Sequence, residues 1–178
     1  MIFVLTGPVH SGKTTFLKKL VTRLKEKRLL LSGYLSEQVV MGQEIDGYDL
    51  IELTSGKRQA FLRKSGFQDE LLSAGAFYFL PEGLRTAAGI IRSGVEAELL
   101  IVDEVGPAEI SEKGIWPELS EVSKRVNCLL VVRDRLLPDF ISLIKTEPEE
   151  IFRPGQTEQA EKVALKIMRV MRSKKSGG

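Results

Sequence analysis

Cysteine, histidine and tryptophan are nearly absent from this sequence, with one residue of each among 178. A single cysteine, Cys128, cannot form an intramolecular disulfide, and nothing therefore points to an oxidising compartment. Cys128 lies in the apolar run 126–132, which predicts a small buried side chain.

An excess of charge of one sign is also missing. The 26 basic and 24 acidic residues are interspersed and give a net charge of +2, so no basic stripe indicates a nucleic-acid partner, and protein partners stay open. No run reaches the roughly 18 apolar residues that a membrane span needs. The apolar start 1–6 lacks the basic residues and cleavage site of a signal peptide. We expect a cytoplasmic protein without membrane contact.

The sequence also lacks the low hydrophobicity that is typical of disordered chains. Hydrophobic residues make up 43% of the chain and charged residues 28%, which is typical of folded globular proteins. A chain of this length fits one domain. We predict a single domain over residues 1–172 and a frayed tail over 173–178.

Strands and helices are predicted to alternate, which favours an α/β fold of three layers with a largely parallel central sheet and an inserted β-hairpin region. Continuous apolar runs indicate buried strands, and apolar residues three and four apart indicate helices. Turn residues between β-prone stretches indicate the hairpin. The patterns place strands at 2–6, 99–105, 126–132 and 150–153, helices at 13–27, 81–94, 116–125, 136–145 and 157–170 with Thr157 as a cap, a hairpin at 29–53, and short strands around a loop within 60–80.

A phosphate-binding motif lies between the first predicted strand and the first predicted helix. The segment Gly7-Pro-Val-His-Ser-Gly-Lys-Thr14 matches the Walker A pattern G-x-x-x-x-G-K-[ST]. Backbone N–H groups of such a loop, together with the positive end of the helix dipole, form a concave site for polyanions. The motif therefore predicts a bound nucleoside triphosphate, ATP included.

Two polar residues of the loop have a predicted role. Lys13 is expected to reach the β- and γ-phosphates and to act in catalysis, and the Thr14 hydroxyl to bind Mg²⁺. His10 fills a variable position and is not expected to be catalytic. The predicted nucleotide-binding residues are Gly7, Pro8, Val9, His10, Ser11, Gly12, Lys13, Thr14 and Thr15.

Two consecutive carboxylates, Asp103 and Glu104, end the second buried strand. Ligands of open α/β sheets bind beyond the carboxyl ends of the strands, so this pair is predicted to face the phosphate loop. Asp103 suits Mg²⁺, as in a Walker B motif, and Glu104 is a candidate for positioning or deprotonating the attacking water. Without the loop, two such carboxylates are more often solvated, so the functional interpretation depends on the loop.

Two arginines, Arg133 and Arg135, follow the third buried strand. Charge that develops on phosphoryl oxygens during transfer favours a nearby arginine. Either side chain is able to face the nucleotide, and an exposed loop position is the alternative for both. Arg133 is the preferred catalytic candidate.

The phosphate loop with the stretch Val102-Asp-Glu-Val-Gly-Pro-Ala-Glu109 resembles the small nucleoside-triphosphatase family that includes the human cancer-related nucleoside-triphosphatase. The stretch Ser32-Gly-Tyr-Leu-Ser-Glu-Gln-Val39 is similar as well, so the likeness covers most of the chain. The resemblance implies a P-loop NTPase fold and Mg²⁺-dependent hydrolysis of several nucleoside triphosphates to diphosphate and phosphate. It also implies a place for Glu37 after the second strand, either lining the site or exposed on the hairpin.

Two other functions fit the same motifs. A nucleotide or small-metabolite kinase uses the same loop and metal carboxylate, and a nucleotide-dependent switch module binds the triphosphate to change a partner's state. No Asn-Lys-x-Asp signature for guanine is present, so the base preference is open.

Overall fold

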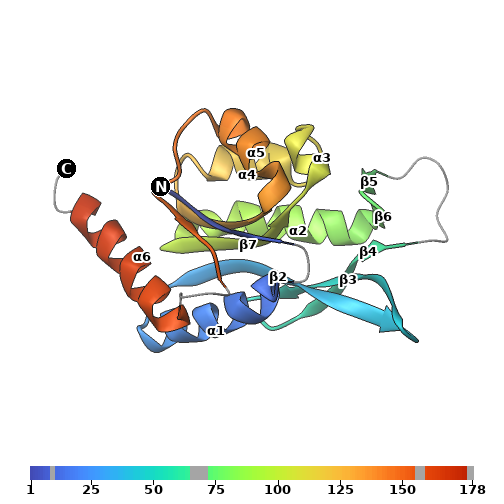
Figure 1. The fold of residues 1–178 in the computed structure, drawn as a ribbon, viewed down its shortest axis with the longest axis horizontal. Helices are drawn as coiled ribbons and strands as arrows, with labels where there is room; N and C mark the ends of the chain where they lie inside the picture. The colour runs from blue at the N-terminus through green and yellow to red at the C-terminus, as the bar shows by residue number, and fades with distance from the viewer. Residues whose placement is uncertain (9–10, 65–71, 155–158, 176–178) are drawn as a thin grey trace.

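The computed structural model describes residues 1–8, 11–64, 72–154 and 159–175. These residues form one nine-stranded sheet with helices on both faces, as Figure 1 shows. The strand order is β5-β6-β4-β3-β2-β7-β8-β1-β9. The strands are β1 (Ile2–Gly7), β2 (Leu31–Met41), β3 (Glu44–Glu52), β4 (Arg58–Arg63), β5 (Ser73–Ala74), β6 (Phe77–Phe79), β7 (Leu99–Val105), β8 (Asn127–Arg133) and β9 (Glu150–Phe152).

Six α-helices connect or follow these strands, with short 3₁₀ turns at Gly94–Glu96 and Asp134–Leu136. Helix α2 begins at Pro81, as predicted, because a proline at the first helical position has no N–H that the helix needs. The α-helices in the described part of the chain are α1 (Lys13–Glu26), α2 (Pro81–Ser93), α3 (Pro107–Ile110), α4 (Trp116–Val122), α5 (Leu137–Ile144) and α6 (Ala160–Lys175).

The parallel part of the sheet consists of β2, β7, β8, β1 and β9. Strand β8 lies between β1, which leads into the phosphate loop, and β7, which ends in the two carboxylates. The carboxyl ends of parallel strands meet at one edge of the sheet. The topology therefore brings the loop, the acidic pair and Arg133 to the same edge.

The antiparallel part extends the sheet through β3, β4, β6 and β5. Strand β2 belongs to both parts, because it pairs with β7 on one side and with β3 on the other. Gly33 allows the pairing with β7: its φ is 112°, and an added Cβ would lie 1.8 Å from the carbonyl oxygen of Ile101. The inserted hairpin predicted from the sequence is thus an extension of the central sheet.

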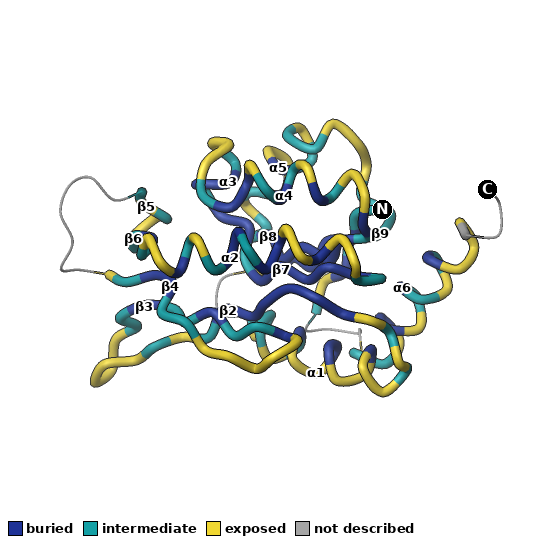
Figure 2. The backbone as a smooth tube through the Cα atoms, turned by 180° about the vertical axis from the view of Figure 1, so that it is seen from behind, coloured by how far each residue is buried: buried dark blue, intermediate teal, exposed yellow. Residues whose placement is uncertain are grey.

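Two hydrophobic cores lie on the two faces of the sheet, and the buried strands between the helical layers are dark blue in Figure 2. Helices α1 and α6 lie side by side on one face, and α2, α3, α4 and α5 cover the other, which gives the three predicted layers. Cys128 is fully buried, in agreement with its predicted structural role. No helix among the described residues is long and apolar enough to cross a membrane.

The last helix differs from the prediction at its end. Helix α6 continues through Lys175, three residues into the segment 173–178 that the sequence predicted as a tail. The Ser173 hydroxyl donates to the carbonyl of Val170, and Lys174 forms an ion pair with Glu149 at 2.5 Å. The added turn thus has one hydrogen bond within the helix and one ion pair outside it. The predicted cap Thr157 and most of the predicted loop within 60–80 lie outside the described residues.

Candidate functional site

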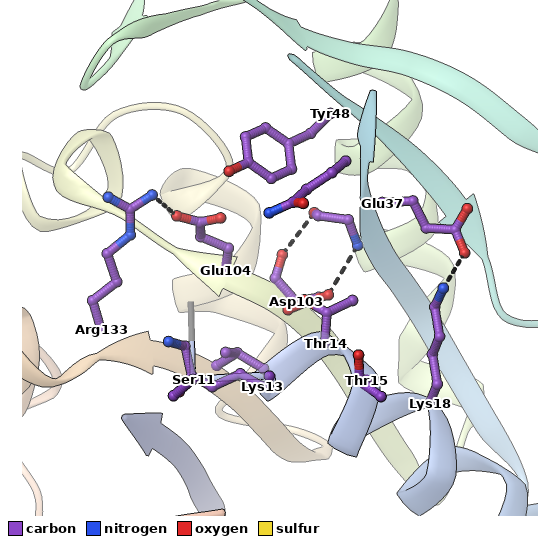
Figure 3. A pocket seen from close by; sticks show the side chains of 14 residues that line it. Ser11, Lys13, Thr14, Thr15, Lys18, Glu37, Tyr48, Asp103, Glu104 and Arg133 are labelled. Carbon is purple, nitrogen blue, oxygen red and sulfur yellow. Dashed lines mark hydrogen bonds and ion pairs between the residues drawn. The ribbon is translucent and has the colours of Figure 1, made fainter. Parts of the chain in front are cut away.

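A cleft of about 460 Å³ opens at the carboxyl edge of the parallel strands. Figure 3 shows side chains from the phosphate loop, β2, β3, β7 and β8 facing it. The cleft thus joins four segments of the sequence, within 11–18, 36–48, 103–104 and 131–133. Its lining residues are Ser11, Gly12, Lys13, Thr14, Thr15, Lys18, Ser36, Glu37, Gln38, Tyr48, Asp103, Glu104, Val131 and Arg133.

The phosphate loop forms one wall of the cleft. Gly12 precedes α1 with a left-handed φ of 78°, a conformation that glycine adopts without a Cβ penalty. The Lys13 ammonium donates a hydrogen bond to the carbonyl oxygen of Gly7 at 2.9 Å and another to that of Pro8, so it lies folded over the loop. Burial lowers the pKa of Lys13, and the carboxylate of Glu104 opposes this effect.

The nine predicted nucleotide-binding residues are placed to different extents. Five of them, residues 11–15, line the cleft, while Gly7 and Pro8 contact Lys13 from behind. Val9 and His10 lie outside the described residues. The structure therefore describes the loop at residues 7–8 and 11–15.

Asp103 lies opposite Thr14 and is only 2% exposed. Its Oδ2 accepts a hydrogen bond from the backbone N–H of Ser36 at 3.0 Å, and the Ser36 hydroxyl donates to the Asp103 carbonyl oxygen at 2.9 Å (Figure 3). Burial raises the pKa of Asp103 to about 7, and the hydrogen bonds from Ser36 and Thr14 moderate the rise. A buried carboxylate beside a hydroxyl is a set of hard oxygen donors, which fits Mg²⁺.

Glu104 enters the cleft because β7 contains a bulge. Val102 pairs with Leu130 and Val105 with Val132, so three steps along β7 match two along β8. Glu104 has a φ of 82°, a left-handed conformation that costs a non-glycine residue on the order of 1–3 kcal/mol. The extra residue returns Val105 to the buried face and leaves the Glu104 side chain in the cleft.

Arg133 meets Glu104 across the end of β8. The guanidinium donates to Glu104 Oε1, and both side chains are about one quarter exposed (Figure 3). Arg135 is exposed and does not line the cleft, because the chain turns into the 3₁₀ segment after Arg133. Of the two arginines that the sequence offered, the geometry therefore selects Arg133 as the one that faces the cleft.

Glu37 lines the cleft and is not a solvated hairpin charge. Its carboxylate forms ion pairs with Lys18 of α1 and Arg58 of β4, and the hydrogen bond from Lys18 is the main cause that lowers its pKa. The network continues through Asp49, which pairs with Arg58 at 3.2 Å and with Arg63 at 2.7 Å. These contacts tie the hairpin to the helix that begins at the phosphate loop.

Five lining residues were not predicted as site residues: Lys18, Ser36, Gln38, Tyr48 and Val131. Ser36 fixes Asp103, and burial raises the pKa of Tyr48, a rise that a hydrogen bond with Gln38 partly offsets. For Ser36 and Gln38 the signal in the sequence was the stretch 32–39, whose similarity to the family did not show which strand lies beside it. The pairing of β2 with β7 supplies that neighbour.

The pKa of Asp103 predicts a pH-dependent stability. Between pH 3.8 and about 7 the folded protein holds a proton that the unfolded chain has released, so the free energy of unfolding falls as the pH rises toward 7. Asp103→Asn has no such titrating group. Its free energy of unfolding, measured relative to that of the unsubstituted protein, should therefore rise by roughly 2 kcal/mol from pH 5 to pH 8. Urea unfolding without Mg²⁺ at both pH values measures it. A constant difference between the two proteins would contradict the burial argument.

Strand β1, its glycine-containing loop and helix α1, with an acidic pair on β7 beyond an intervening strand, define an α/β protein with the P-loop NTPase fold. A family model described as NTPase matches residues 2–170. The chain therefore belongs to the NTPase family, which confirms the resemblance seen in the sequence.

Individual relatives agree with this assignment. The nucleoside-triphosphatase THEP1 of Archaeoglobus fulgidus is 30% identical over 141 residues, which cover 77% of this chain and 82% of the relative. The nucleoside-triphosphatase THEP1 of Hyperthermus butylicus is 29% identical over 154 residues, which cover 84% and 79%. The solution structure of a human cancer-related nucleoside triphosphatase aligns with a TM-score of 0.69 over 96% of this chain and 97% of that one, at 19% identity. This last likeness supports the fold.

Proposed function

We propose that the protein hydrolyses nucleoside triphosphates to nucleoside diphosphates and phosphate with Mg²⁺. The observation that carries the proposal is the single cleft in which Lys13 and Thr14 face Asp103 and Glu104. The relatives named nucleoside-triphosphatase support the same reaction. Hydrolysis requires a phosphate cradle, a metal site and a base for water, and the cleft offers a candidate for each.

The metal would be held by the Thr14 hydroxyl and the Asp103 carboxylate. A hydrogen bond already joins these two groups, so their oxygen atoms lie close together. Bound Mg²⁺ supplies positive charge that neutralises the β- and γ-phosphate oxygens. The hydrogen bond from Ser36 to Asp103 Oδ2 orients the carboxylate for this role.

Lys13 and Arg133 are the cationic groups proposed for the phosphates. Both have protein partners in the free protein: Lys13 donates to loop carbonyls, and Arg133 to Glu104. A γ-phosphate in the cleft offers Lys13 charged oxygens in place of neutral carbonyl oxygens, and it offers the Arg133 guanidinium an acceptor that suits bidentate hydrogen bonding. We propose that Lys13 binds the β- and γ-phosphates and that Arg133 stabilises the charge of the transition state.

Glu104 is proposed as the group that positions and deprotonates the attacking water. Its side chain is accessible from the cleft, and the bulge directs it away from the core. When Arg133 turns to the phosphate, the Glu104 carboxylate leaves its ion pair and can accept a hydrogen bond from water. Triphosphate binding would thus prepare the base.

Phosphate release tests the proposal. The purified protein is incubated with ATP, GTP, CTP or UTP, with Mg²⁺ or with a chelator, and phosphate is measured over time. We expect release from several triphosphates in the presence of Mg²⁺ and none with the chelator. Tight binding of all four triphosphates without phosphate release would reject hydrolysis as the function.

Phosphoryl transfer to a small acceptor is a second candidate. The cleft continues past the loop to Glu37 and Gln38 on β2, which pairs with β7, and to Tyr48 on β3, the next strand. This polar extension has room beside the phosphates for an acceptor hydroxyl or phosphate. Labelled γ-phosphate that appears on a nucleoside or nucleoside monophosphate, and not as free phosphate, would establish transfer.

A further inference from the structure

Glu109 is a buried carboxylate that lies outside the cleft, on the short helix α3 after the acidic pair. It is 3% exposed. Its Oε2 accepts a hydrogen bond from the backbone N–H of Gly106 at 2.9 Å, and its Oε1 accepts one from that of Ile115 at 3.3 Å. A buried carboxylate is costly unless it is hydrogen-bonded. Glu109 therefore ties two separate backbone segments together through one charged group.

The first of these segments leads directly from Glu104. Gly106 is two residues beyond Glu104, and Val105 between them is fully buried. On the other side of Glu104, the backbone and side chain of Asp103 are both bonded to Ser36. Left-handed backbone at a residue other than glycine persists only when its surroundings hold it. On the downstream side, the bond from Gly106 to Glu109 adds to the pairing of the buried Val105 with Val132.

The second segment, at Ile115, has a backbone that leaves space for the Glu109 carboxylate. Gly114, next to Ile115, has a left-handed φ of 62°. A Cβ at this position would lie 2.2 Å from Glu109 Oε1. Only glycine leaves room there, so the chain from α3 to α4 is shaped around the Glu109 carboxylate.

We propose that Glu109 is a positioning residue for hydrolysis, which acts through Glu104. By anchoring Gly106 to Ile115, it holds the bulged end of β7 in the conformation that presents the Glu104 carboxylate to the cleft. Glu109 itself has no contact with nucleotide or metal in this role. The proposal rests on the proposed function, because positioning matters only if Glu104 serves the reaction.

The substitution Glu109→Gln tests the role with almost no change of shape. Glutamine has one acceptor oxygen and one NH₂ group, so one of the two backbone N–H groups would face another donor. We expect kcat for Mg²⁺–ATP to fall at least about tenfold, because base positioning contributes to the chemical step. The Kd of a non-hydrolysable ATP analogue should stay within about twofold, because the loop is untouched.

A control separates positioning from general loss of stability. Leu119→Ala truncates a fully buried side chain of α4, in the hydrophobic core that also contains Val105 and Ile115. It should lower the urea midpoint and leave kcat within about twofold, since truncation of a core leucine destabilises the fold without touching the site. A similar fall of kcat in Leu119→Ala would overturn the specific role of Glu109.

Combination with Glu104→Gln shows whether the effect passes through Glu104. In that background, Glu109→Gln should lower kcat by less than about twofold, because there is no carboxylate base left to position. Independent, multiplying losses would overturn the proposal, as would a large rise in the Kd of the analogue. If Glu109→Gln does not fold, Gly114→Ala displaces the same carboxylate from the side of Ile115, and normal kcat in that variant would overturn the proposal.

The outcomes for the two proposals are distinguishable. Absence of phosphate release from the unsubstituted protein would remove the proposed function and the role of Glu109 with it. Loss of turnover in Glu104→Gln with normal kcat in Glu109→Gln would leave hydrolysis in place and reject the positioning role alone.

Discussion

Replacement of Glu104 by glutamine should lower kcat for triphosphate hydrolysis by about 10²- to 10⁴-fold, the usual contribution of a general base. Glutamine keeps the length of the side chain and an oxygen that accepts the hydrogen bond from Arg133, so the cleft should keep its shape. It cannot accept the proton of the attacking water at neutral pH. The Kd for Mg²⁺–ATP should change less than threefold, and single-turnover phosphate release with equilibrium binding measures both quantities.

Glu37→Gln is the matched control, because Glu37 also carries a carboxylate that lines the cleft. Lys18 and Arg58 hold that carboxylate, so it is not free to serve as a base. Its replacement should lower kcat by less than about tenfold. Equal losses in the two variants would indicate that the total charge of the cleft matters and that Glu104 has no special role.

Strands β1, β7 and β8 of the parallel part of the sheet were predictable from the sequence, because each depends on a local pattern. Apolar runs of four or five residues predicted β1, β7 and β8, and the rule that ligands bind at the carboxyl ends of strands brought the loop and the acidic pair together. Of the candidates, Lys13, Thr14, Asp103, Glu104 and Arg133 all line the observed cleft.

Features that depend on long-range pairing were not predictable in the same way. Ser36 was only part of a β-prone stretch until its strand was seen beside β7, where it bonds to both the backbone and the side chain of Asp103. The bulge at Glu104 is a mismatch of register between two strands, and neither strand shows it alone. Glu109 was only the last residue of the stretch 102–109 that resembles the family, because its burial comes from the return of the chain at Gly114.

Replacement of Lys13 by alanine should weaken the binding of Mg²⁺–ATP by at least about 100-fold, because hydrogen bonds to charged groups are worth about 1.5–3 kcal/mol each and Lys13 can make more than one to the phosphates. In the free protein the ammonium is folded over the loop and bonded to the carbonyls of Gly7 and Pro8. Phosphate oxygens carry full charge and carbonyls do not, so the lysine should exchange its partners when the triphosphate enters. Lys19→Ala removes an equal charge from an exposed position of α1 that does not line the cleft, and its affinity should stay within about twofold. Isothermal titration with a non-hydrolysable analogue compares the two variants, and similar Kd values would show that the loop holds phosphate through its backbone alone.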